Sequence, residues 1–216
     1  MARALRPDLP PPPSPQWPAK TTAELVAAKP SDEEFGRLPR APISVVLDNV
    51  RSLANVGLIF RLCDAVRVER LYLCGITGHP PYPDPARDPR LPEQQQRALR
   101  EIGKTAVMAI PYVPWEYRPS AVDVARELQG RGYQVVAVEQ AHGSRPYTEP
   151  GIYRPPLCLV FGHERAGVAP AALGLADVCV EVPMYGMANS LNVAMALAVV
   201  SFEVLRQHSG FGLQPL

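Results

Sequence analysis

The first segment of the chain whose residues could do chemistry runs from Asn49 to Arg61 and reads Asn-Val-Arg-Ser-Leu-Ala-Asn-Val-Gly-Leu-Ile-Phe-Arg. It follows a short apolar run, and we expect Asn55 to open a helix that carries Arg61. The free N–H groups and the dipole at the start of a helix favour an anion, and a guanidinium can grip phosphate. Gly57 would leave the backbone between them approachable. The same residues also allow a plain N-cap asparagine and a solvated arginine.

A second segment, Val160 to Val168, reads Val-Phe-Gly-His-Glu-Arg-Ala-Gly-Val. Gly162 and Gly167 bracket a charged trio just after an apolar run, as a tight turn beneath a ligand requires. Alternatively, Glu164 caps the turn and His163 is an ordinary surface residue. Because no partner stands at metal-ligand spacing from His163, we expect no metal site.

The third segment, Val182 to Asn192, reads Val-Pro-Met-Tyr-Gly-Met-Ala-Asn-Ser-Leu-Asn and leads into a long apolar helix. Ser190 is expected to open that helix, and a serine at this place needs no further role. Asn192, however, is a poor choice for the first turn of so apolar a helix unless its amide has a specific partner. This oddity favours a functional interpretation of the segment.

Alternating strand and helix patterns position the three segments. Apolar runs predict strands at 43–47, 71–74, 134–138, 157–161 and 178–182, and helical spacing predicts helices at 53–66, 93–102, 122–128 and 190–207. This alternation predicts an α/β fold with a mainly parallel sheet and helices on both faces. Each segment follows the carboxyl end of a strand, where open α/β sheets bind ligands.

Proline divides the chain. Of 216 residues 26 are proline, and they cluster between Pro7 and Pro18 and again between Pro80 and Pro92. We interpret residues 1–42 as a Pro-rich arm and linker, disordered or polyproline-like over 1–19, with one short helix around residues 22–28. Residues 43–216 are expected to form one domain.

Composition excludes several classes of protein. The net charge of +1 gives no global basic field, so any nucleic-acid site must be local. The chain has neither a G-x-G-x-x-G after its first strand nor a P-loop motif, which weakens a dinucleotide or NTPase interpretation. Its four cysteines, at 63, 74, 158 and 179, form no C-x-x-C pair and fit free thiols in a reducing cytoplasm. The longest apolar run, residues 193–200, is too short to span a membrane, and we expect a cytoplasmic protein.

Taken in order, the three segments resemble the three motifs of the SpoU/TrmH family of RNA 2′-O-ribose methyltransferases, in the SPOUT superfamily, over residues 43–207. The matching positions are Asn55-x-Gly57-x-x-x-Arg61, Phe161-Gly162-x-Glu164-x-x-Gly167, and Val182-Pro183-Met184-x-Gly186 followed by Ser190-Leu191-Asn192-Val193. Residues around 73–77, 103–106 and 115–117 are similar to a single-domain branch of the family. One departure is Ala194, where many members carry a second serine.

The resemblance implies a SPOUT fold with a C-terminal trefoil knot that holds S-adenosyl-L-methionine, a homodimer, and RNA as partner. It implies a cofactor pocket walled by Val138, Gly162, Val182, Met184 and Leu191. It also implies a catalytic group made of Arg61 with Asn55, Glu164, Ser190 and Asn192. Because a guanidinium is hard to deprotonate, we expect Arg61 to grip phosphate, stabilise the developing oxyanion and relay the proton, with no metal ion required.

Two other functions stay open, a catalytically inactive RNA-binding paralogue and an α/β enzyme with an unrelated nucleotide ligand. Intact Arg61, Glu164 and Asn192 argue against the first, and the missing phosphate motifs argue against the second. The RNA could be tRNA or rRNA, and the absence of an added N-terminal RNA-binding domain mildly favours tRNA. The proline-rich loop at 75–92 either contacts RNA, through Arg87, Arg90 and Arg97, or is a solvated loop stiffened by proline.

Overall fold

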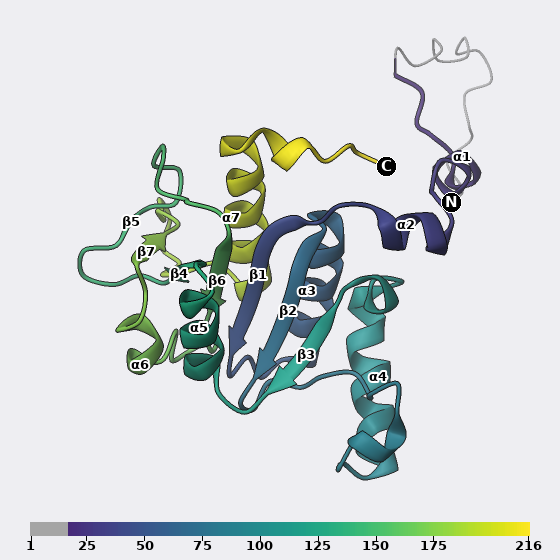
Figure 1. Cartoon of the computed structure of the whole chain (residues 1–216), viewed down its shortest axis with the longest axis horizontal. Helices are drawn as coiled ribbons and strands as arrows, with labels where there is room; N and C mark the ends of the chain where they lie inside the picture. Colours follow the sequence, from purple (N-terminus) through teal and green to yellow (C-terminus); the bar gives the residue numbers. More distant parts are fainter. Residues whose placement is uncertain (1–16) are drawn as a thin grey trace, which may run out of the picture. The chain divides into compact units, whose positions relative to one another are not determined.

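The computed structural model of the chain describes residues 17–216 and is drawn in Figure 1. Of these, residues 17–38 together with Pro215 and Leu216 form one compact unit, and Pro39–Gln214 form another. The division predicted from the sequence, with an arm at 1–42 and a domain at 43–216, stays a prediction.

The smaller unit contains two short helices, α1 (Thr22–Ala27) and α2 (Asp32–Arg37). Each begins with a capping box, in which Thr21 or Ser31 accepts from the backbone three residues on and a glutamate reaches back. The helix predicted around residues 22–28 is confirmed, whereas α2 was not predicted. Most of the predicted polyproline-like stretch at 1–19 lies outside the described residues.

The larger unit alternates strands and helices. Its elements are β1 (Ala41–Asp48), α3 (Leu53–Ala65), β2 (Val68–Cys74), α4 (Pro92–Ala106), β3 (Trp115–Arg118), α5 (Ala121–Gly130), β4 (Gln134–Val138), β5 (Arg145–Pro146), β6 (Leu157–Phe161), α6 (Pro170–Leu173), β7 (Val178–Glu181) and α7 (Val193–Gln207), with 3-10 turns at Pro85–Arg87, Ile110–Tyr112 and Ser209–Gly212. The five predicted strands correspond to β1, β2, β4, β6 and β7. Strands β3 and β5 and helix α6, which are two to four residues long, were not predicted.

The strands form one sheet in the order β3-β2-β1-β6-β4-β7-β5. Every neighbouring pair is parallel, with Val45 of β1 aligned to Leu71 of β2 and to Leu159 of β6. The insertion of β6 between β1 and β4 brings together the carboxyl ends of strands that are far apart in sequence. The predicted α/β fold with a mainly parallel sheet is therefore confirmed, and the C-terminal trefoil knot stays a prediction.

Both faces of the sheet are covered. Alternate residues of a strand point to opposite faces, so Val45 and Leu47 join the core beneath α3, α4 and α7, while Val46 joins the core beneath α5 and α6. In Figure 1, α5 lies on the viewer's side of the sheet and α3 and α7 lie behind it. Strands buried on both faces consist of continuous apolar runs, and for this reason these strands could be predicted from the sequence.

Gly57 serves the packing of α3 against α4. A Cβ at this position would lie 2.1 Å from Thr105 Oγ1 and 2.3 Å from the Ile102 carbonyl oxygen. The Thr105 hydroxyl also donates to the Ala54 carbonyl, at 2.9 Å. The expectation that Gly57 leaves the backbone open between Asn55 and Arg61 is wrong, since the close approach here is between two helices.

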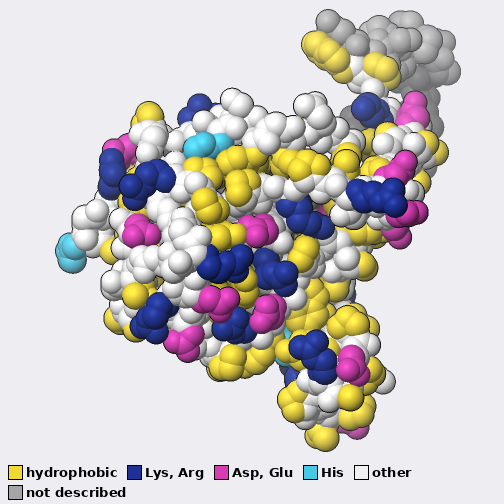
Figure 2. All heavy atoms as spheres, in the orientation of Figure 1, with side chains coloured by type: hydrophobic (Ala, Val, Ile, Leu, Met, Phe, Trp, Pro, Cys, Tyr) yellow, Lys and Arg dark blue, Asp and Glu magenta, His cyan; other side chains and the backbone are white. Residues whose placement is uncertain are grey.

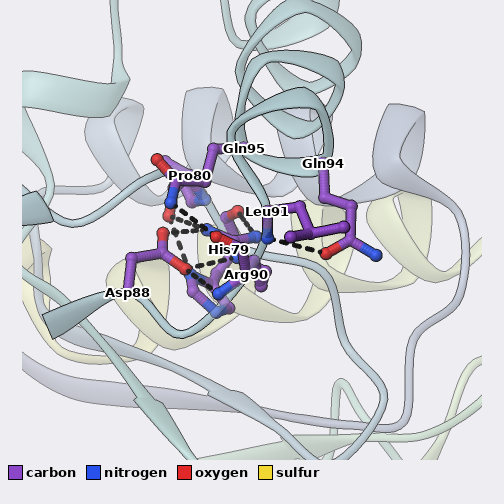
Figure 3. A network of polar contacts seen from close by, with 7 residues as sticks. All are labelled: His79, Pro80, Asp88, Arg90, Leu91, Gln94 and Gln95. Atoms are coloured by element: carbon purple, nitrogen blue, oxygen red, sulfur yellow. Dashed lines mark hydrogen bonds and ion pairs between the residues drawn. The ribbon is translucent and has the colours of Figure 1, made fainter.

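The proline-rich loop at 75–92 is held by Arg90 (Figure 3). Its guanidinium donates to the carbonyls of His79 and Pro80, at 2.8 and 3.1 Å, and to both carboxylate oxygens of Asp88, at 2.8 and 2.7 Å. The hydrogen bond from Arg90 lowers the pKa of buried Asp88 to about 2. Arg90 thus has a structural role, which leaves exposed Arg87, over the Tyr82 ring, and Arg97 as the arginines of this loop region that face solvent.

Charge is distributed without a dominant sign on the face shown in Figure 2, where basic and acidic side chains are interspersed. Within residues 17–216, no helix is long and apolar enough to cross a membrane, and no group of three or more His, Cys, Asp or Glu side chains could hold a metal ion. The four cysteines are free thiols, and burial raises the pKa of Cys74 and Cys158 to about 12.

Candidate active site

A cavity of about 330 Å³ opens at the carboxyl ends of β4, β6 and β7 and at the start of α7. Its lining includes four of the five residues predicted to wall a cofactor pocket, namely Val138, Gly162, Val182 and Leu191. Half-buried Met184, the fifth, lies two residues beyond Val182 and is not part of the lining.

The glycines of the second segment make a tight turn. His163 and Gly167 exchange two backbone hydrogen bonds, of 3.0 and 2.9 Å, and Gly167 has a positive φ of 70°. A Cβ on Gly162 would lie 2.1 Å from backbone atoms of Gly167 and Val168. The predicted tight turn after β6 is therefore confirmed, and both glycines are required by its geometry.

Glu164, at the tip of this turn, reaches the start of α3. Its Oε1 accepts from the backbone N–H of Ser52, at 2.9 Å, and from Asn55 Nδ2, at 3.0 Å. Its Oε2 accepts from the backbone N–H of Arg51, at 3.1 Å. Partial burial opposes ionisation, but the hydrogen bonds outweigh it and lower the pKa of Glu164 below its usual value. The carboxylate therefore ties the second segment to the first.

Asn192 connects the third segment to the same group. Its Nδ2 donates to Asn55 Oδ1, at 2.9 Å, and its Oδ1 accepts from the backbone N–H of Ala194, at 2.9 Å. Asn192 is thus the N-cap of α7, which begins at Val193. The prediction that Ser190 opens this helix is wrong. Exposed Ser190 lies two residues before the cap and lines the cavity.

Asn55 completes the connection between the segments. Ser52 is the N-cap of α3, with its hydroxyl accepting from Asn55 N at 3.2 Å, so Asn55 lies in the first turn and does not open the helix. The side chain of Asn55 is buried and uses both its amide groups, one toward Glu164 and one toward Asn192. Three of the predicted catalytic residues, from three distant segments, therefore form one hydrogen-bonded chain.

Arg61 does not belong to this hydrogen-bonded group of side chains. It is exposed on α3, about 9 Å from Asn55 along the helix axis and turned about 120° around it. It does not line the cavity, and within residues 17–216 no hydrogen bond or ion pair joins it to another residue.

The cavity residues that were missed include Glu139, Gln140 and Glu181. Glu139 Oε2 accepts from Val168 N, at 2.8 Å, and Gln140 Nε2 donates to the Asn189 carbonyl, at 2.7 Å. These contacts link the end of β4 to the second and third segments. A usable signal was present, because Glu139 and Gln140 directly follow the strand predicted at 134–138 and Glu181 lies near the end of the strand predicted at 178–182.

The sequence profile of the SpoU rRNA methylase family matches residues 42–202, which contain the whole network and the cavity. The chain belongs to this family. It is also 32% identical, over 84% of its length and 83% of the relative's, to a tRNA (guanosine(18)-2′-O)-methyltransferase from Thermus thermophilus.

Solved structures agree with this assignment to the SpoU methylases. The Aquifex aeolicus TrmH/SpoU tRNA modifying enzyme has a TM-score of 0.62 at 29% identity, covering 83% of this chain and 85% of that one. An AdoMet-bound rRNA methyltransferase from Sinorhizobium meliloti has a TM-score of 0.61 at 28% identity, covering 82% of this chain and 59% of that one. The predicted SPOUT-type α/β fold of this SpoU methylase is thereby confirmed.

Proposed function

We propose that the chain is an S-adenosyl-L-methionine-dependent methyltransferase that modifies a ribose 2′-OH in structured RNA, with tRNA favoured over rRNA. The observation that carries this proposal is the hydrogen-bonded chain of Glu164, Asn55 and Asn192, which joins three distant segments beside a cavity at the strand ends. Relatives named as tRNA (guanosine(18)-2′-O)-methyltransferases support the choice of tRNA.

The cavity suits this cofactor. Its volume is at the small end of the range for ligand sites, about 300–1,000 Å³. Apolar walls at Val138, Leu191 and Val193 suit an aromatic base, and carboxylates on the same lining suit a cationic ligand. When bound, the cofactor supplies a methyl group carried on a positively charged sulfur.

The protein's own residues would hold the RNA and assist loss of the 2′-OH proton. Because a guanidinium stays protonated in proteins, Arg61 is suited to gripping a phosphate and stabilising a developing oxyanion. Asn55 and Asn192 have fixed amides, whose orientation Glu164 and the start of α7 determine. Exposed Ser190, on the cavity wall, is free to position the hydroxyl.

A homodimer would explain the position of Arg61. Leu58 is 38% exposed and lies one turn before Arg61 on the same side of α3. On α7, which contacts α3, Met195 and Phe202 are 60% and 50% exposed. Apolar side chains on two adjoining helices suit an interface between two copies, with Arg61 at its edge reaching the other copy's cavity.

Calorimetry and methyl-transfer assays on Arg61→Ala test the function. We expect this variant to bind S-adenosyl-L-methionine like the wild type and to lose methyl transfer to unmodified tRNA transcripts. Arg126→Ala, a solvent-facing arginine on α5, serves as the control and should retain activity. Failure of the wild type to bind the cofactor would refute the proposal, and cofactor binding without transfer to any RNA would support the inactive paralogue.

Mixing two inactive variants tests the placement of Arg61. If Arg61 acts on the other copy, equal amounts of Arg61→Ala and Asn192→Ala chains should recover about a quarter of wild-type activity, since half of the dimers are mixed and each has one intact site. If Arg61 acts within its own chain, the mixture stays inactive. Sedimentation of the wild type measures the dimer directly.

A further inference from the structure

The cavity lining carries an excess of negative charge. Its ionisable side chains are the carboxylates of Glu139, Glu164 and Glu181, the guanidinium of Arg165, and the imidazole of His163. The backbone N–H groups of Arg165 and Ala166 donate to His163 Nδ1, at 3.0 and 3.2 Å, so this ring nitrogen acts as an acceptor. The lining therefore contains three carboxylate side chains and one guanidinium.

Two of these glutamates lie at adjacent strand ends. Strands β4 and β7 are parallel neighbours with Val138 aligned to Val180, so Glu139 and Glu181 follow at adjacent strand ends, about 4.8 Å apart between backbones. Glu164, by contrast, is engaged with the start of α3. Two of the three glutamates of the lining therefore lie next to each other, at the ends of β4 and β7.

The partners of this pair are neutral. Glu139 accepts from the backbone N–H groups of Val168 and Gln140, at 2.8 and 2.9 Å, and Glu181 accepts from the Ser144 hydroxyl, at 2.8 Å. Within residues 17–216, neither carboxylate forms an ion pair with an arginine or lysine. Hydrogen bonds fix the positions of both carboxylates and leave their charges without a counter-ion, so a cationic ligand in the cavity is favoured.

Building on the proposed function, we propose that Glu139 and Glu181 make the cavity selective for the positively charged methyl donor over its neutral product. In the transfer, the methyl–sulfur bond breaks with its electron pair remaining on sulfur, the methyl group bonds to the ribose oxygen, and the hydroxyl proton passes to solvent water. The sulfonium becomes an uncharged thioether, so the product has one positive charge fewer than the donor. The wall that attracts the donor thus loses this attraction when the reaction is complete.

Isothermal titration calorimetry of donor and product measures this selectivity without turnover. We expect Glu139→Gln and Glu181→Gln each to lower the ratio of donor affinity to product affinity by about threefold to tenfold, with product affinity little changed. An analogue with a protonated amine in place of the sulfonium should behave like the donor. In the wild type, added salt should weaken donor binding more than product binding.

Glu116→Gln is the matched control, since it removes a carboxylate from β3, four places from β4 in the sheet. The ratio of donor affinity to product affinity in this control should equal that of the wild type. Unchanged ratios in both cavity variants, with thermal melting showing that they fold, would overturn the proposal even though both ligands bind. If either variant fails to fold, the salt dependence of the wild type still decides, because equal salt effects on donor and product refute selection by charge. A wild type that binds neither ligand would instead refute the proposed function.

Discussion

Replacement of Glu164 should destabilise the protein in a pH-dependent way. The carboxylate accepts three hydrogen bonds, two on Oε1 and one on Oε2. In Glu164→Gln the amide oxygen can keep the donors of Ser52 and Asn55, while the Arg51 N–H loses its acceptor. Hydrogen bonds to charged groups contribute about 1.5–3 kcal/mol each to the free energy of unfolding. Because the Glu164 side chain is exposed, each of its hydrogen bonds is expected at the low end of this range. We expect a loss of about 1–2 kcal/mol for glutamine and about 2–3 kcal/mol for alanine.

The pH dependence follows from the lowered pKa of Glu164. A carboxyl group whose pKa is lower in the folded state stabilises the protein at pH values above its unfolded-state pKa. This stabilisation is lost as the pH falls through the folded-state pKa. The difference in stability between wild type and Glu164→Gln should therefore be constant from pH 7 to about pH 5 and shrink below the ordinary value of 4.5.

Thermal melting followed by circular dichroism provides the assay. For a chain of this size, 1–2 kcal/mol corresponds to a fall of about 3–6 °C in Tm at pH 7. Glu116→Gln removes a half-buried carboxylate on β3 whose ion pairs with Arg70 and Arg118 are long, at 4.0 and 3.6 Å, so it should shift Tm by less than about 2 °C. A Glu164→Gln protein that melts with the wild type at pH 7, or whose deficit is as large at pH 3, would refute this account of the carboxylate.

Three further substitutions separate roles that the structure assigns. Asn192→Asp keeps an N-cap acceptor but loses the donor amide. Its Tm should therefore stay within about 3 °C of the wild type, while its methyl-transfer activity should fall at least about tenfold. A fully active variant would contradict the proposed site. Gly57→Ala should lower the free energy of unfolding by about 1–3 kcal/mol, because the new Cβ would meet α4. Gly103→Ala is the control and should not destabilise the protein, because a Cβ there has open space. Equal melting curves for the two variants would contradict this packing. Arg90→Lys should lower Tm and raise the pKa of Asp88 from about 2 toward its usual value, which NMR titration can measure. An unchanged pKa would show that the Arg90 hydrogen bonds do not cause the low pKa of Asp88.

Sequence patterns predicted the strands that build the centre of the fold, because β1, β4 and β6 are buried on both faces and therefore continuously apolar. The resemblance of the three motifs, in this order, to the SpoU/TrmH family implied Asn55, Glu164 and Asn192 as members of one group. The edge strand β3 was missed, because four half-buried residues carry little periodic signal.

What the sequence could not predict depends on contacts through space. Glu139 finds its partner Val168 at a distance of 29 residues along the chain, and only the pairing of β4 with β6 brings them together. Gly57 looked like an opening for a ligand because nothing local indicates that α4 packs against it. Asn192 looked out of place inside a helix because the true helix start, at Val193, is set by its own cap.

The double use of Asn192 restricts how this chain can change over evolutionary time. Its one planar amide accepts from the backbone of α7 and donates to Asn55, 137 residues earlier in the chain. Aspartate offers only acceptors, serine offers a single atom, and glutamine places its amide one methylene further out. Substitution here must wait for a compensating change at Asn55, so the two positions are free to vary only together.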